Sequence, residues 1–113
     1  MEEAGQLSLD IFQAKNALII LSPIAGTPLK DVTITVTEDV LTIKGSRLCP
    51  HNPDERDYLT KECFWGEFSR SIVLPKNANT KEIKATSLNN ILEIHIPKTS
   101  EEKTKVVKIN VDQ

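Results

Sequence analysis

Four side chains in and beside one polar stretch of the chain are of types that could do chemistry. Cys49, His51, Asp54 and Cys63 could ligate zinc, and the Cys49 thiol could act as a nucleophile with His51 as its base. Their spacing, however, matches no zinc pattern, and nothing in the sequence supplies the orienting group and oxyanion hole that a nucleophile requires. We therefore predict that the protein is not an enzyme and binds no metal.

Cofactor and redox chemistry have equally little support in the sequence. The four glycines stand far apart, so there is no glycine-rich loop for a phosphate-bearing cofactor, and we expect none. Cys49 and Cys63 form no C-x-x-C pair. They can be interpreted as two reduced thiols or as a disulfide pair that responds to redox conditions, and the first interpretation is favoured.

Arg70 is the charged residue whose position is hardest to explain. It alternates with Phe68 and Ile72, so all three side chains share one face of a strand. An arginine on an apolar face is costly unless its charge is compensated. Either Arg70 has a charged partner, or it lies at an edge with its stem packed and its head in water. His95, in contrast, is expected on a solvent-exposed face.

Composition limits the class of protein. The chain has 113 residues, 39% of them hydrophobic and 27% charged, which suits one globular domain. The formal net charge of −2 gives no basic surface for nucleic acid. No apolar run approaches the roughly 20 residues that span a bilayer, and the first residues do not resemble a signal peptide. We therefore expect a cytoplasmic protein without nucleic-acid or membrane partners.

Short apolar runs separated by turn residues predict an all-β protein. Residues 91–96 show the pattern well, with Leu92, Ile94 and Ile96 facing inward and Glu93 facing outward. Eight such runs predict an immunoglobulin-like two-sheet β-sandwich. The predicted strands are residues 7–12, 17–21, 32–37, 40–44, 58–64, 68–74, 83–88 and 91–96. The polar residues 46–57, with Pro50 and Pro53, form a loop long enough to suggest a function.

The motifs along these strands resemble a known family. Residues 66–75 read G-x-F-x-R-x-I-x-L-P, residues 85–92 read A-x-x-x-N-N-I-L, and residues 40–45 read V-L-x-I-x-G. Together they resemble the α-crystallin domain of small heat-shock proteins over residues 7–111. The turn differs from the family's usual Asn-Gly, because this chain has Asn89 and Asn90. Asn tolerates positive φ, so the hairpin is expected to form.

The resemblance implies a division of the chain into three parts. Residues 1–6 are a short N-terminal remnant, residues 7–97 the α-crystallin domain, and residues 98–113 a C-terminal extension. Family members usually carry a longer hydrophobic N-terminal arm, which helps to drive large assemblies. We therefore expect dimers or small exchanging oligomers rather than large shells.

The resemblance also implies where subunits meet. In bacterial and plant members, a strand carried by the long loop pairs with a strand of the partner subunit. The residues assigned to this dimer interface are Tyr58, Leu59, Thr60, Lys61, Glu62, Arg70, Leu9 and Ile11. The tail motif, Ile109 and Val111, resembles an I-x-V segment that docks into a neighbour's groove. The groove, which is also the candidate client site, is assigned to Val32, Ile34, Val36, Ile83, Ala85 and Leu88.

The function implied by the resemblance is that of an ATP-independent molecular chaperone in the stress response. Such a holdase binds non-native client proteins and prevents their aggregation. It would form homodimers by strand exchange, with higher oligomers through the tail. The alternative is a co-chaperone or protein-interaction sandwich without holdase activity. An extracellular adhesion or sugar-binding sandwich is disfavoured, because the sequence lacks a secretory signal and has few aromatic residues.

Overall fold

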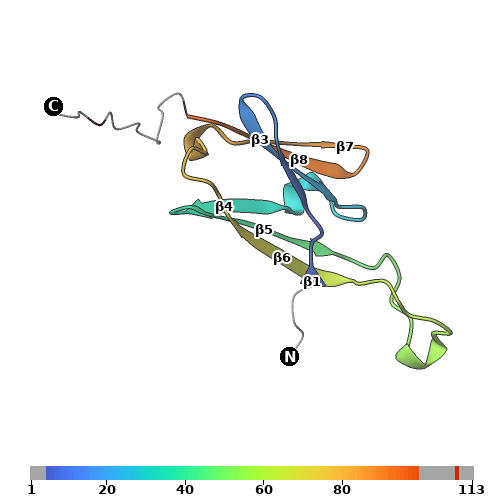
Figure 1. Ribbon diagram of the computed structural model, residues 1–113. Helices are drawn as coiled ribbons and strands as arrows, with labels where there is room; N and C mark the ends of the chain where they lie inside the picture. The colour runs from blue at the N-terminus through green and yellow to red at the C-terminus, as the bar shows by residue number, and fades with distance from the viewer. Residues whose placement is uncertain (1–4, 100–108, 110–113) are drawn as a thin grey trace.

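The computed structural model describes residues 5–99 and residue 109, and it places two four-stranded β-sheets face to face (Figure 1). The predicted all-β, two-sheet sandwich is confirmed. In spatial order, sheet A contains β1 (Gly5–Gln6), β6 (Gly66–Val73), β5 (Val40–Arg47) and β4 (Thr33–Thr37). Sheet B contains β2 (Asp10–Gln13), β3 (Ala17–Pro23), β8 (Ile91–Pro97) and β7 (Lys84–Leu88).

The core lies between the two sheets and follows the period-two pattern of the strands. Leu92, Ile94 and Ile96 of β8 are fully buried, and they face Leu41 and Ile43 of β5 across the sandwich. Glu93 and His95 are exposed on the outer face, as predicted. Each fully buried aliphatic side chain contributes about 1.5–3 kcal/mol. These two central strands therefore supply much of the stability of the domain.

Tight turns with residues at positive φ join β4 to β5 and β7 to β8. Glu38, between β4 and β5, has φ 56°. Asn89 and Asn90, between β7 and β8, have φ 54° and 63°, so both turn residues occupy the left-handed region that a two-residue hairpin requires. The predicted Asn-Asn turn is confirmed. Three short 3-10 helices lie in other connections: η1 (Leu29–Asp31), η2 (Glu55–Asp57) and η3 (Thr80–Glu82).

The prediction of one strand over residues 7–12 is wrong. β1 pairs in parallel with β6 of sheet A, whereas β2 pairs antiparallel with β3 of sheet B. Between them the chain crosses from one sheet to the other, and this crossing buries Leu7. Two hydrogen bonds hold the crossing: Arg70 Nη1 donates to the Leu7 carbonyl at 3.0 Å, and Ser22 Oγ to the Ser8 carbonyl at 2.7 Å.

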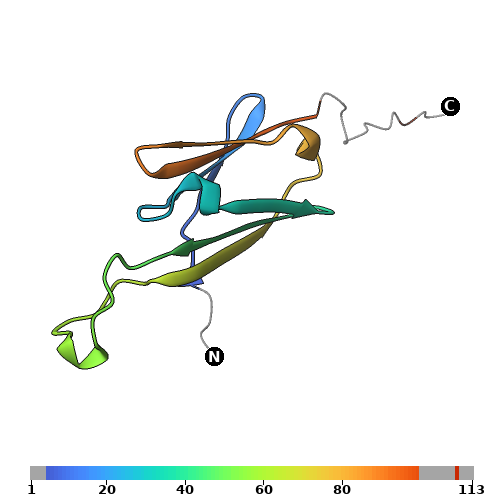
Figure 2. The ribbon, with the colours of Figure 1, turned by 180° about the vertical axis from the view of Figure 1, so that it is seen from behind.

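The predicted strand over residues 58–64 is also absent. Residues 48–65, here called the long loop, leave β5 and β6 and project away from the sandwich with η2 near the tip (Figures 1 and 2). A β-strand needs a neighbouring strand to accept and donate its backbone hydrogen bonds. Within this chain, no described segment pairs with residues 58–64.

The crossing also decides how the strand edges are arranged. Because Leu7, Ser8 and Leu9 connect β1 directly to β2, these two edge strands lie on the same side of the sandwich. β4 and β7 are therefore the edge strands of the opposite side. β1 pairs only with Phe68 and Ser69 of β6. Among the described strands, β1, β2, β4 and β7 are the edge strands, and each has one unpaired side. None of the helices in the described part of the chain could cross a membrane.

Candidate protein-interaction site

The core reaches solvent where β4 and β7 form neighbouring edges. Ile34 and Val36 of β4 pair with the fully buried Ile43 and Leu41, so they point inward, yet both remain half-exposed. On β7, Ala85 pairs with the buried Ile94 and also points inward, but it is exposed. We call the inward-facing residues Ile34, Val36, Ile83 and Ala85 the open edge.

Four of the six residues assigned to the groove pack against the core from this side. Val32, Ile34, Val36 and Ile83 are half-buried and contact the core cluster. Ala85 shares the inner face but lies in solvent. Leu88 does not belong with them, because it is three residues from Ala85 and faces the outer side of sheet B beside Ile91. The assignment of Leu88 to the groove is therefore corrected.

The second exposed edge is β2, which lies on the opposite side of the sandwich. All four of its residues are exposed, including Ile11 and Phe12. Leu9 and Ile11 share the inner face, because Ile11 pairs with the buried Ile20, and Leu9 packs against the core. The free side of β2 carries backbone N–H and C=O groups that no described strand pairs with.

The residues assigned to strand exchange lie on the distal part of the long loop. Tyr58 is half-buried, Leu59 is fully exposed, and Thr60, Lys61 and Glu62 are exposed. Lys61 Nζ donates to Glu55 Oε1 at 2.7 Å and lies 4.8 Å from the centre of the Tyr58 ring. The hydrogen bond to Glu55 is the main cause of the raised pKa of Lys61. The Leu59 side chain is therefore accessible for contact with another surface.

Arg70 lies on β6, eight residues after Glu62. Its side chain is half-buried on the same face as Phe68, as predicted, and its guanidinium donates to the Leu7 carbonyl. None of the ion pairs between described residues includes Arg70. The structure thus gives this side chain a role that the sequence did not suggest, which is to hold the crossing between the sheets.

The tail motif falls only partly within the described residues. Ile109 is described and is 82% exposed, whereas Val111 lies outside the described residues. An isoleucine this exposed buries almost none of its apolar surface in its own domain. It is therefore free to contact another surface.

The residues first considered for chemistry lie on the long loop and on β8. Cys49 and Cys63 are free thiols, the first half-buried and the second exposed. No group of three potential metal ligands occurs within the described residues. Cys49, His51 and Asp54 all lie on the long loop, and His95 is exposed on β8.

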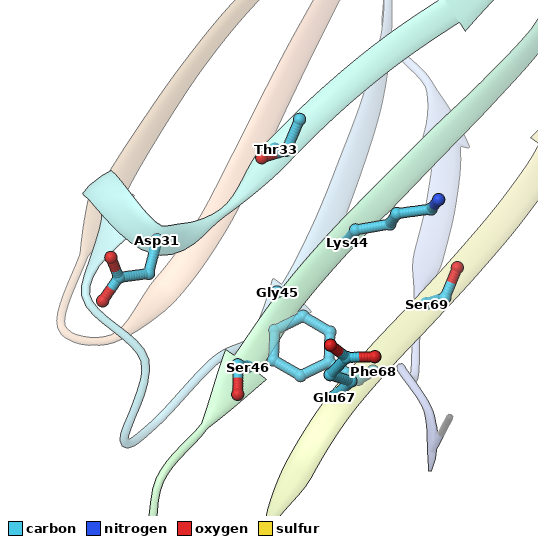
Figure 3. A pocket seen from close by; sticks show the side chains of 8 residues that line it. All are labelled: Asp31, Thr33, Lys44, Gly45, Ser46, Glu67, Phe68 and Ser69. Carbon is cyan, nitrogen blue, oxygen red and sulfur yellow. The ribbon is translucent and has the colours of Figure 1, made fainter. Parts of the chain in front are cut away.

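A hollow on the outer face of sheet A is lined by polar and apolar groups and carries charges of both signs (Figure 3). Asp31 and Lys44 point in opposite directions across it, and Glu67 lies on β6. The remaining lining residues are Thr33, Gly45, Ser46, Phe68 and Ser69. Charges that diverge in this way provide no obvious centre for one ligand.

The sequence analysis missed a cluster at the base of the long loop. The Phe68 ring packs against Gly45, and the guanidinium of Arg47 lies 5.9 Å from the ring centre. Arg47 Nε also donates to the Ala25 carbonyl at 2.7 Å. This cluster fixes the point from which the loop leaves the sandwich. The glycine in V-L-x-I-x-G was the available signal, since glycine in a strand often marks a close approach.

Comparisons with known proteins agree with this architecture. The model of the Hsp20/alpha crystallin family matches residues 10–112. Small heat shock protein C2 of Rickettsia felis is 33% identical over 100 residues, covering 88% of this chain and 65% of that protein. The 26.5 kDa mitochondrial heat shock protein of Arabidopsis thaliana is 34% identical over 92 residues, covering 79% of this chain and 39% of that protein. The chain thus matches less than two thirds of the length of these relatives.

Solved structures share the fold. The hspA of Xanthomonas axonopodis aligns with a TM-score of 0.78 and 25% identity, covering 85% of this chain and 96% of that chain. A small heat-shock protein of Xylella fastidiosa aligns with a TM-score of 0.76 and 23% identity, covering 93% and 96%. With the family model matching nearly the whole described sandwich, the chain belongs to the Hsp20/alpha crystallin family of small heat shock proteins.

Proposed function

We propose that this protein is an ATP-independent chaperone that binds non-native proteins and prevents their aggregation. Its family supports a chaperone role. The observation that carries the proposal is the open edge, where inward-facing apolar residues of β4 and β7 remain accessible. An unfolding protein exposes apolar side chains and unpaired backbone, and an edge of this kind can bind both.

Binding at the open edge would be weak for any single contact. Complete burial of an aliphatic side chain contributes about 1.5–3 kcal/mol, and Ile34 and Val36 are already half-buried in the free protein. Ordering a flexible client opposes this gain. Affinity would therefore come from several contacts made together, and its selectivity would be low, since apolar and main-chain contacts discriminate little. A holdase acts by such mass action, competing with the client's self-association.

The proposed dimer combines two exposed features of the chain. The segment carrying Tyr58 and Leu59 would leave its own subunit and pair with β2 of the partner. That pairing would satisfy the free backbone groups of β2 and cover Leu59 and Ile11. At about 3.3 Å per residue, the long loop is long enough to cross between subunits. Arg70, beside the crossing that leads to β2, is proposed to contact the same interface.

We expect suppression of aggregation to depend on the inner face of β7 and not on nucleotide. The Ala85→Asp variant places a charge on the open edge and should weaken suppression of a heat-denatured client at least threefold. The matched control is Thr86→Asp, an exposed neighbour on the outer face of the same strand, which should act like the parent. Light scattering of the client would be measured with and without ATP and with a chelator. A requirement for ATP, or equal loss in both variants, would refute the proposal.

The tail motif is expected to mediate association beyond the dimer. Replacing Ile109 and Val111 by serine should leave the fold and dimer intact but reduce larger species at all concentrations. Two aliphatic side chains contribute only about 3–6 kcal/mol before ordering costs, so tail contacts should be weak and concentration-dependent. Replacing Lys108 and Asn110 by serine provides the control. Light scattering after size exclusion would measure particle mass, and unchanged larger oligomers in the first variant would rule out the tail.

A further inference from the structure

The two cysteines lie near the two ends of the long loop, Cys49 on the segment that leaves β5 and Cys63 on the segment that leads into β6. We call this part of the loop its neck. The last pair of the β5–β6 ladder is Arg47 with Gly66. Cys49 follows Arg47 by two residues, and Cys63 precedes Gly66 by three. At about 3.3 Å per residue, the Cα atom of neither cysteine can be farther than roughly 10 Å from the paired residue on its own segment. Pro50 additionally biases Cys49 towards an extended backbone, which continues the direction of β5.

An electrostatic contact supports the same proximity. The pKa of Lys61 is raised chiefly by its hydrogen bond to Glu55, and the last and smallest cause is an electrostatic contribution from Cys49. Cys49 is therefore near a residue only two positions from Cys63.

The loop can adjust enough to join the two sulfur atoms. Its side-chain ion pairs in the described structure are Lys61 with Glu55 and Arg56 with Asp54, and both are local and exposed. None of the described residues 48–65 is fully buried. A disulfide requires Cα atoms about 4.4–6.8 Å apart, and movement of these exposed loop segments beside the fixed Arg47–Gly66 pair can bring the two cysteines together.

We propose that Cys49 and Cys63 are a reversible thiol modification site, which peroxides oxidise to an intramolecular disulfide that closes the neck of the long loop. The exposed Cys63 thiolate attacks one peroxide oxygen, the O–O bond breaks, and a sulfenic acid and water form after protonation. The Cys49 thiolate then displaces the sulfenic oxygen as water and forms the S–S bond. Two thiols and one hydrogen peroxide thus yield one disulfide and two water molecules. A dithiol reverses the reaction and is itself oxidised.

The consequence for assembly depends on the proposed strand exchange. The disulfide joins the two chain segments beside the Arg47–Gly66 pair and closes a loop of about a dozen residues. This restricts the number of conformations that the unbound loop can adopt. Residues 58–62 would then lose less entropy on binding β2 of the partner. Oxidation should therefore stabilise the dimer and slow the exchange of subunits.

The disulfide can be tested on the full chain with hydrogen peroxide as the oxidant. Trypsin cuts after Arg47, Arg56, Lys61 and Arg70, which places the two cysteines on separate peptides, residues 48–56 and 62–70. Oxidised protein should give these peptides joined, migrate as a monomer on a non-reducing gel, and return to free thiols with dithiothreitol. The reaction should be at least fivefold faster in the folded chain than in urea. Covalent dimers, unreacted thiols, or equal rates in both states would overturn the proposal.

Subunit exchange measured by energy transfer between labelled subunits provides the second readout. Oxidised parent should exchange at least threefold more slowly than reduced parent, whereas peroxide should not affect exchange in Cys49→Ser or Cys63→Ser. Faster or unchanged exchange in the oxidised parent would refute the stabilising effect. If the reduced chain is a monomer, the strand-exchange proposal fails, while the peptide analysis still decides whether the disulfide forms.

Discussion

Replacing residues 48–65 with an Asn-Gly turn should convert the protein from a dimer into a monomer that keeps its fold. Arg47 and Gly66 are already paired, so a two-residue turn can close the β5–β6 hairpin at this point. None of the described residues in the removed segment is fully buried, and the core cluster contains none of them. The dimer should be weakened at least 100-fold, which corresponds to about 2.8 kcal/mol.

Sedimentation velocity across a wide range of protein concentrations would measure this change, and circular dichroism would check the fold. The control keeps the length of the loop but replaces Tyr58, Leu59 and Thr60 by glycine and serine. It should lose the dimer as well, since the exchanged segment and not the length of the loop makes the contact. A folded, loop-deleted chain that remains dimeric at micromolar concentration would place the interface elsewhere.

Much of the fold could be predicted because its signals are local. The alternation of Leu92, Ile94 and Ile96 with polar residues fixed the inner face of β8. The two asparagines of the β7–β8 turn correctly indicated positive φ. In both cases the physical cause lies within a few residues of the signal, as side-chain alternation and turn conformation do not depend on distant partners.

The errors arose where hydrogen-bond partners decide the structure. Leu7, Leu9 and Ile11 alternate as one strand would, and alternation cannot show that the chain changes sheets between them. Residues 58–64 have a weak strand pattern, but none of the described strands of the same chain pairs with them. Leu88 is different, because its odd spacing from Ala85 already placed it on the other face of β7. That error was avoidable from the sequence.

The role of Gly45 shows why the site could be predicted only in part. The motif V-L-x-I-x-G was recognised, but the residue that needs the glycine is Phe68, which lies on the next strand in the ladder. The β5–β6 register pairs Gly45 directly with Phe68. Predicting that contact requires the register between β5 and β6. The register cannot be inferred from the sequence, because the loop between the two strands is long and irregular.

Gly45→Ala should therefore destabilise the domain by about 1–3 kcal/mol, although it adds only one methyl group. A Cβ at residue 45 would lie 2.8 Å from Phe68 Cε1 and 3.2 Å from Cε2, with Cζ nearer still. Phe68 is 3% exposed, so its ring has little space to move. Gly45 is not among the residues at positive φ, so the cost is steric and exceeds the roughly 0.4–1 kcal/mol that alanine gains by restricting the unfolded chain.

The steric origin can be separated from a general loss of stability by a compensating change. Phe68→Leu alone should cost roughly 1–2 kcal/mol, because it leaves a small cavity. Combined with Gly45→Ala, it should restore much of the lost stability, since the shorter side chain leaves room for the methyl group. Gly66→Ala is the matched control: Gly66 has φ +118°, and its Cβ would contact only Phe64 Cζ, at 3.9 Å. Backbone strain would destabilise that variant, and Phe68→Leu should not rescue it.

Urea unfolding would measure all five variants against the parent. Equal rescue of both alanine variants, or a Gly45→Ala protein as stable as the parent, would show that the Phe68 ring does not pack on Gly45. The same ring lies beneath Arg47, where the long loop begins, so a destabilised Gly45→Ala protein should also form a weaker dimer.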